Sequence, residues 1–233
     1  MGVEGVFPRT VFYLNGIPIR DTVFQTWIIN GLLIVFAIWA SFKYRVFEPK
    51  TWQLGVEYLV EYIEGLIRDL SGRAIPELVP YLGTMIVYIV IANLVGLVPL
   101  FLAPTRDLNT TAALSLVSLG STQYYGIRAR GLKAYLRSYI EPVIIMLPLN
   151  ILGDLSRVLS MSLRLFGNVL AGEIIGAVMF TLVPVLSPLP LNLLSMITGV
   201  LQALVFTVLT LVFVVDAIGE VQSTDEREQT LET

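Results

Sequence analysis

The sequence predicts an all-α polytopic membrane protein with about five membrane helices, an amphipathic surface helix, and a last pair of helices forming a long tilted hairpin. Of the 233 residues, 55% are hydrophobic and 14% are charged. A soluble domain has about 25% charged residues. The apolar residues form runs long enough to cross a bilayer, with short polar segments between them. Composition and patterning therefore both indicate a membrane protein.

The chain contains no cysteine and no histidine. Disulfides and thiolate metal sites are therefore excluded, and the imidazole that most often carries protons near neutral pH is missing. We expect no cofactor and no metal. The few basic residues are scattered, so no nucleic-acid partner is expected either. Any proton that this chain handles must use carboxylates, hydroxyls, water or groups of a partner.

The first half of the chain divides into five segments. Residues 1–22 are polar and aromatic, with proline and glycine as turn signals. Residues 23–42 carry no charge and are long enough for a first span. Residues 48–75 place apolar side chains at helical spacing among acidic and basic ones, which is typical of a helix on the membrane surface. The second and third spans are expected at 81–102 and 112–127, and the third is so rich in hydroxyl groups that neighbouring helices must shield it.

Residues 141–183 are the unusual segment. As one helix they would be about 64 Å long, about twice the hydrocarbon thickness of a bilayer. No polar loop divides the segment into two spans, so we expect a single, strongly tilted helix. A proline-rich turn leads to the last span at 191–215, and residues 219–233 form an acidic tail whose composition favours disorder.

The distribution of lysine and arginine predicts the orientation. Basic residues gather at 43–50 and 128–137, in segments separated by an even number of spans, so both segments should be cytoplasmic. Residues 1–22 are then outside, residues 23–218 form a single membrane domain, and the tail is inside. We expect the plasma (inner) membrane of a bacterium, in preference to an organelle such as a plastid.

Arg164 is the residue that points most directly to function, because it stands within a very apolar stretch. A guanidinium stays charged at any cellular pH. Placing it at membrane depth costs about 2.5–3.5 kcal/mol on insertion scales, and the usual reason is an ion pathway or a buried counter-charge. No acid of the chain is an obvious mate, so we expect the counter-charge on another chain.

Helical spacing relates the other polar residues of this segment to Arg164. Arg157 lies seven residues earlier on the same stripe, and the small residues Gly167 and Ala171 continue it. Small side chains allow another helix to approach closely. Glu173 lies about 180° around the helix from Arg164, so the two charges are expected to face different surroundings.

The last span carries a second polar stripe. Ser195, Gln202 and Asp216 lie seven and fourteen residues apart, with Thr198 nearby. If the last two helices pack antiparallel, Gln202 is expected to lie level with Arg164.

Each of these polar groups also has a purely structural alternative. A long cation can snorkel to the interface or pair with an acid at i+3, an amide can join two helices, and a hydroxyl can bond its own helix backbone. A charged turn can simply be solvated, and an acid can be structural. Snorkelling, or the pairing at i+3, is the alternative for Arg157 with Asp154, and joining two helices is the alternative for Gln202. Bonding to the helix backbone applies to Ser195 with Thr198. Solvation of a charged turn applies to Arg106 with Asp107, and a structural carboxylate is the alternative for Glu173.

Two segments carry a resemblance to a known family. Residues 162–173, SLRLFGNVLAGE, closely resemble the central motif of subunit a of F-type ATP synthase, and residues 201–206, LQALVF, are similar to its second motif. Weaker matches stand at 107–111 and 148–152. The resemblance covers about residues 25–218, and the central motif is highly specific.

The resemblance implies a non-catalytic stator subunit in which two offset aqueous half-channels lie beside a ring of c subunits. Each c subunit carries a membrane carboxylate, which Arg164 attracts while it separates the two paths. Glu173 then lines the outer half-channel, with Asn168, Asp107 and Gln202 as nearby polar groups. The implied partners are the c ring, subunit b of the peripheral stalk and the lipid bilayer.

The sequence departs from the family pattern at two positions. Ser195 stands where some members carry a titratable residue, so the outer path is expected to rely on Glu173 and ordered water alone. Gly153 stands where many members carry an acid, and Asp154 is expected to substitute for it in the inner path, on a shifted face. Both H⁺ and Na⁺ are compatible with these features.

Two other classes of protein compete with this interpretation. A self-contained transporter would use Arg164 to bind an anionic substrate, but it predicts internal repeats, and none is visible. An intramembrane enzyme would need a nucleophile with a base, and the chain offers neither histidine, cysteine nor such a carboxylate pair.

Overall fold

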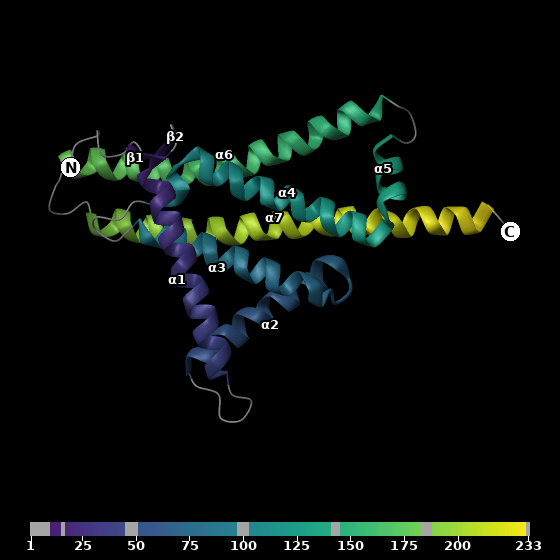
Figure 1. Ribbon diagram of the computed structural model, residues 1–233, viewed down its shortest axis with the longest axis horizontal. Helices are drawn as coiled ribbons and strands as arrows, with labels where there is room; N and C mark the ends of the chain where they lie inside the picture. The colour runs from purple at the N-terminus through teal and green to yellow at the C-terminus, as the bar shows by residue number, and fades with distance from the viewer. Residues whose placement is uncertain are drawn as a thin grey trace.

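The computed structural model describes residues 10–14, 17–44, 51–96, 103–140, 145–182 and 188–231. These residues form an all-helical membrane domain with a two-stranded hairpin at its start (Figure 1). The elements are β1 (Thr10–Leu14), β2 (Ile17–Arg20), α1 (Asp21–Lys43), α2 (Thr51–Ser71), η2 (Pro76–Leu78), α3 (Val79–Val95), η3 (Pro104–Arg106), α4 (Leu108–Arg130), α5 (Leu132–Ile140), α6 (Met146–Leu182) and α7 (Pro188–Leu231).

Four helical segments of the described chain are long and apolar enough to cross a membrane. They are Asp21–Lys43, Pro76–Val95, Met146–Leu182 and Pro190–Ile218. The remaining expected span is α4, which has 23 residues but a more polar composition. Its hydroxyl side chains, such as Ser115 and Ser118, are buried, and α4 packs against α6 and α7. Neighbouring helices therefore provide the shielding that this sequence requires.

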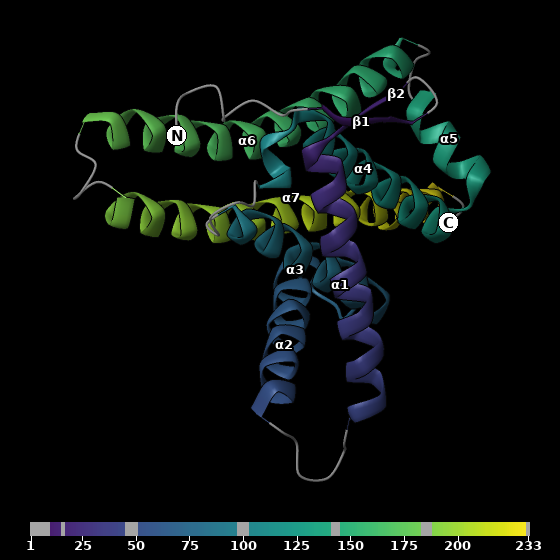
Figure 2. The ribbon, with the colours of Figure 1, turned by 60° about the vertical axis from the view of Figure 1, so that its left-hand side comes forward.

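The expected single helix at 141–183 is confirmed over the described residues by α6. Its 37 residues make it about 56 Å long, well beyond the hydrocarbon thickness of a bilayer. It runs antiparallel beside α7, whereas α1 crosses the pair steeply (Figures 1 and 2). The long hairpin is thus inclined to the first span. Residues 141–144 and 183 lie outside the described residues.

The interior is formed where α2, α3, α6 and α7 meet. Its fully buried side chains include Ile63, Leu82, Ile89, Leu165 and Phe206. In lipid, helices associate through close packing and interhelical hydrogen bonds, because the solvent is as apolar as the side chains. A close approach of this kind is found at Gly199, where an added Cβ would lie 3.1 Å from the Cβ of Asn93.

The expected basic loop at 128–137 is wrong in part, because most of it is helical. α4 continues to Arg130, the chain turns at Gly131 with φ +80°, and α5 follows. Glycine adopts this left-handed backbone without a steric cost. At Gly126 an added Cβ would lie only 2.6 Å from the ring of Tyr135, so the missing side chain lets α5 fold back onto α4.

The two ends of the chain also differ from the composition-based expectation. β1 and β2 pair antiparallel with Leu14 opposite Ile17, and Pro18 lies within β2. The signals Pro8 and Gly16 lie outside the described residues. The acidic tail continues α7 as helix to Leu231, because its Glu, Gln and Arg residues are good helix formers.

Candidate functional site

Arg164 lies at the centre of α6, and its side chain is exposed. Within the described part of the chain, no hydrogen bond or ion pair involves its guanidinium. The expectation that its counter-charge comes from another chain is consistent with this placement. A permanent cation on an otherwise apolar helix face can attract an anion that a neighbouring molecule presents.

The exposed face of α6 around Arg164 is lined by small side chains. They recur at three- and four-residue spacing on both sides of it, at Gly153, Ser156, Ser160, Gly167 and Ala171. An added Cβ at Gly153 or Gly167 would meet nothing within 4 Å. Exposed leucines, Leu159 and Leu163, border this strip. A second helix can therefore approach the α6 backbone closely next to the guanidinium.

Glu173 faces the inside of the bundle, away from Arg164. Its Oε2 atom accepts a hydrogen bond from Nη1 of Arg106 at 3.3 Å. The Nη2 atom of Arg106 lies 3.6 Å from Oδ2 of Asp21, at the start of α1. Two further charged side chains, which the sequence did not place there, therefore adjoin Glu173, while the reliance of the outer path on Glu173 and ordered water stays a prediction.

The turn at 106–107 is buried, so the solvated alternative is wrong. The Asp107 carboxylate caps α4 by accepting from the Asn109 backbone N–H at 3.0 Å. It also accepts from Thr22 Oγ1 at 2.9 Å and pairs with Nη1 of Arg20 at 3.2 Å. Asp107 thus joins the beginnings of α1 and α4 and holds them together beside Arg106.

Gln202 lies one turn from its expected position. Its Oε1 atom accepts from Asn168 Nδ2 at 2.7 Å, so it is level with Asn168 instead of Arg164. Ser195 lies against Gly172, where an added Cβ would stand 3.2 Å from its hydroxyl oxygen. Thr198 donates to backbone carbonyls of its own helix, as its structural alternative predicts.

Asp154 belongs to a polar cluster that links α4, α5 and α6. Its Oδ2 atom accepts from Tyr139 Oη at 2.7 Å and from Gln123 Nε2 at 3.1 Å. Its Oδ1 atom lies 3.8 Å from Nη1 of Arg157, the pairing at i+3 that the sequence allowed. Burial, followed by the hydrogen bonds with Tyr135 and Asp154, raises the pKa of the Tyr139 hydroxyl. Tyr139 therefore remains a donor to Asp154 across the physiological pH range.

Between this cluster and the centre of α6, hydroxyl groups line the α4 interfaces. Thr111 Oγ1 lies 3.2 Å from Ser162 Oγ, and Ser118 Oγ lies 2.8 Å from Thr210 Oγ1. A small cavity of about 10 Å³ is lined by Ser115, Ser118, Leu119, Thr122, Arg157, Val158, Met161 and Phe213. That volume is about the smallest that holds one water molecule. The recurrence of hydroxyl side chains along the α4 sequence was the signal for these hydroxyl-lined interfaces.

Sequence reasoning missed three polar residues of the outer cluster. A solvated turn was the structural alternative for Arg106, and Asp21 was placed only within the polar and aromatic residues 1–22. Asn93 Nδ2 donates to the Gly199 carbonyl at 2.9 Å, and its Oδ1 accepts from Thr105 at 2.6 Å. The sequence did carry signals for these residues: Asn93 is an amide inside an apolar span, and Arg106 and Asp107 are adjacent charged residues just before a helix.

Comparisons with known proteins place these features in a family context. The sequence pattern of the family described as ATP synthase A chain matches residues 23–215. A protein described as ATP synthase subunit a 2 from Picosynechococcus sp. is 38% identical over 210 residues, which is 89% of this chain and 90% of the relative. A protein with the same description from Bradyrhizobium sp. is 38% identical over 211 residues, which is 91% of this chain and 94% of the relative. An ATP synthase subunit a from Legionella pneumophila is 31% identical over 218 residues, which is 94% of this chain and 95% of the relative.

Proposed function

Since the chain belongs to the ATP synthase A chain family, we propose that it couples ion flow to rotation through Arg164 and two offset half-channels. The protein is a multi-pass membrane protein and a non-catalytic subunit of the membrane sector, where it associates with the other subunits of that sector. The proposal adds that a ring of c subunits faces α6 and that subunit b of the peripheral stalk contacts the domain elsewhere.

The observation that carries the proposal is the exposed guanidinium at the centre of α6, which has no counter-charge within the described residues. It stands on a strip of small residues where another helix can pack. Such an arrangement suits a carboxylate delivered by a moving partner, because the cation is fixed and remains accessible. A guanidinium whose charge was neutralised within its own chain would attract that carboxylate less.

The physics of the coupling follows from the cost of charge in lipid. Near Arg164, a rotor carboxylate is stabilised in its ionised form, so it releases its ion. Away from Arg164, in hydrocarbon, the carboxylate must be neutral, so it moves only after an ion loads. A membrane potential of about 100 mV supplies about 2.3 kcal/mol for each elementary charge that crosses. The fixed cation therefore converts ion loading on one side into rotation in one direction.

The polar clusters at the two ends of the domain suit the two half-channels. Glu173, supported by Asn168, Gln202 and Ser195, is proposed to line the outer path, with Asp107 fixing its frame. Asp154 and the hydroxyl-lined cavity beside α4 are proposed to mark the inner path. The distance along α6 between Glu173 and Asp154 is about 28 Å, so the two clusters are well separated along the tilted helix, as offset half-channels require.

The orientation follows the distribution of basic residues. The α4 end and α5 carry Arg128, Arg130, Lys133 and Arg137, which are proposed to lie on the cytoplasmic side. The start of α1 and the α6–α7 turn then lie outside, in the plasma membrane of a bacterium. The tail at the end of α7 lies in the cytoplasm.

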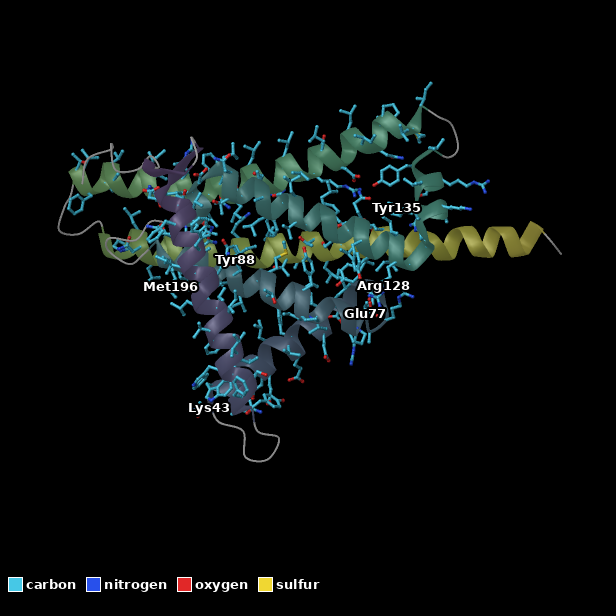
Figure 3. The ribbon with its side chains drawn as sticks, in the orientation of Figure 1. Lys43, Glu77, Tyr88, Arg128, Tyr135 and Met196 are labelled. Carbon is cyan, nitrogen blue, oxygen red and sulfur yellow. The ribbon has the colours of Figure 1, made fainter. Side chains whose placement is uncertain are left out.

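The test is ion-driven ATP synthesis, together with passive ion leak, in membranes that carry Arg164→Ala in the assembled complex. We expect loss of coupled synthesis with normal assembly, and added leak if Arg164 also keeps the half-channels apart. The matched control is Arg128→Ala, which removes an arginine from an exposed pair with Glu77 (Figure 3) and should leave synthesis unchanged. Full coupled activity of Arg164→Ala, or ion transport by the purified chain alone, would contradict the proposal.

A further inference from the structure

The outer cluster contains a buried cation that two carboxylates share. The Arg106 side chain is 1% exposed, whereas those of Asp21 and Glu173 are 17% and 26% exposed. Nη1 of Arg106 lies 3.3 Å from Glu173 and Nη2 lies 3.6 Å from Asp21. The guanidinium is thus enclosed by protein, while each carboxylate keeps an open side from which an ion can reach it.

The charges of this triad do not balance when all three groups are ionised. The neighbouring pair of Arg20 and Asp107 neutralises itself, and Asp107 is fully occupied by Thr22 and the start of α4. Within the described part of the chain, the ion pairs of Arg106 are with two carboxylates, so these three groups together carry an excess of one negative charge. In a weakly polar environment such an excess favours the uptake of one cation.

The three groups come from elements that are distant in the sequence. Asp21 begins α1, Arg106 ends the short helix η3, and Glu173 lies in the second half of α6. α7 contributes Ser195, which lies next to Gly172 and has an uncharged side chain. Among the described residues, the charged groups at this cluster besides Glu173 and Arg106 are Asp21 and the neighbouring pair of Arg20 and Asp107.

We propose that Arg106 is a positioning residue for ion uptake, and that Asp21 and Glu173 compete for its guanidinium. This inference rests on the proposed function, in which Glu173 takes up the ion from the outer side. When Glu173 binds the ion, Arg106 turns toward Asp21, and when the ion leaves, it returns to Glu173. Asp21 thereby sets how tightly Glu173 holds an arriving ion.

The competition predicts opposite effects for two substitutions. Asp21→Asn removes the carboxylate that competes with Glu173 for Arg106 and removes a negative charge, so Glu173 binds a cation less tightly. Arg106→Gln removes the counter-charge of Glu173, so the cation binds more tightly and is released more slowly. A purely structural role of either residue would lower the amount of assembled complex or its maximal rate without moving the two affinities in opposite directions.

The experiment measures the rate of ATP synthesis in vesicles of the assembled complex against the concentration of H⁺ or Na⁺ on the outer side. We expect Asp21→Asn to raise the half-saturating concentration about tenfold, and Arg106→Gln to lower it about tenfold with a reduced maximal rate. Arg106→Lys, which keeps the charge, should return most of the wild-type affinity. Arg128→Gln is the matched control, because it breaks an arginine–glutamate pair far from this cluster.

Unmoved half-saturation in Asp21→Asn, or shifts of the same sign in both variants, would overturn the inference. If Arg106→Gln does not assemble, Asp21→Asn still decides, because its partly exposed carboxylate is replaced by an amide of the same size. Arg164→Ala in the same vesicles tests the proposed function separately. Synthesis that survives Arg164→Ala refutes the proposed function, whereas an inactive Arg164→Ala with an unmoved Asp21→Asn refutes this inference alone.

Discussion

Two arginines of this chain, Arg106 and Arg164, stand in opposite electrostatic situations. Arg106 is buried between carboxylates from α1 and α6, and its charge is compensated inside the fold. Arg164 is exposed at the centre of a helix, and nothing in the described part of the chain compensates it. The comparison teaches that a guanidinium with internal partners is held inside the fold, whereas one without them remains available to a neighbouring molecule.

The surroundings of the two residues explain the difference. Arg106 lies on a short turn onto which the start of α1, α4 and α6 converge, so several elements can supply counter-charges. Arg164 lies in mid-helix, and the residues one turn away on its face, Ser160 and Gly167, are too small to reach it. A turn gathers partners, whereas a smooth helix face leaves room for another helix.

The sharpest way to break this comparison is to measure stability in both variants. Arg106→Ala should lower the free energy of unfolding by up to about 3–5 kcal/mol, because it leaves two partly buried carboxylates without their buried cation. Arg164→Ala should change it by less than about 0.5 kcal/mol, because an exposed side chain without partners is removed. Unfolding of the purified chain in detergent measures both values. Equal losses in the two variants would remove the distinction.

A pair of glycine variants sharpens the contrast between a face for a partner and a contact inside the fold. Gly167→Leu should leave the isolated chain folded, since the space beyond its Cβ is open, but it should block the approach of a second helix and abolish most coupled synthesis. Gly126→Leu should instead destabilise the chain by about 1–3 kcal/mol or more, because it collides with Tyr135.

Comparing detergent stability with synthesis in membranes separates the two cases. If Gly167→Leu kept full coupled synthesis, the strip of small residues on α6 would not be the face that a partner uses. If Gly126→Leu were as stable as the wild type, the close approach of α5 to α4 would not matter for stability.

The smallest expected effect concerns the amide pair between the two arginine regions. Asn168→Ala removes the hydrogen bond to Gln202 and should cost about 1 kcal/mol, since the remaining Gln202 side chain is buried. Coupled synthesis should fall only modestly, because neither charge is lost. A loss as large as that of Arg164→Ala would show that the amide pair handles the ion directly.

The sequence predicted the parts of the fold that depend on local pattern. The length and uninterrupted apolar character of α6 indicated one long helix, and α6 confirms it. The hydroxyl-rich third span required shielding, and its Ser115 and Ser118 are buried. The helical tail and α5 were missed because charged residues suggested solvated segments, although their side chains are compatible with helix.

At the site, positions along one helix were predictable and contacts between helices were not. Arg164 and Glu173 were expected to face different surroundings, and they do. Gln202 was expected one turn from its observed partner, because the register of two packed helices depends on side-chain fit, which periodicity does not report. The error of one turn illustrates the limit of that reasoning.

By itself, the sequence determined that a permanent cation would lie at the centre of a long apolar helix, among residues small enough for a neighbour. Those properties depend on residue type and spacing along one element. Only the tertiary structure decided that Arg106 stands between Asp21 and Glu173, because the three groups are separated by 85 and 67 positions and meet through the packing of α1, η3 and α6. Charge pairing across such separations depends on how the helices pack, and no local pattern encodes it.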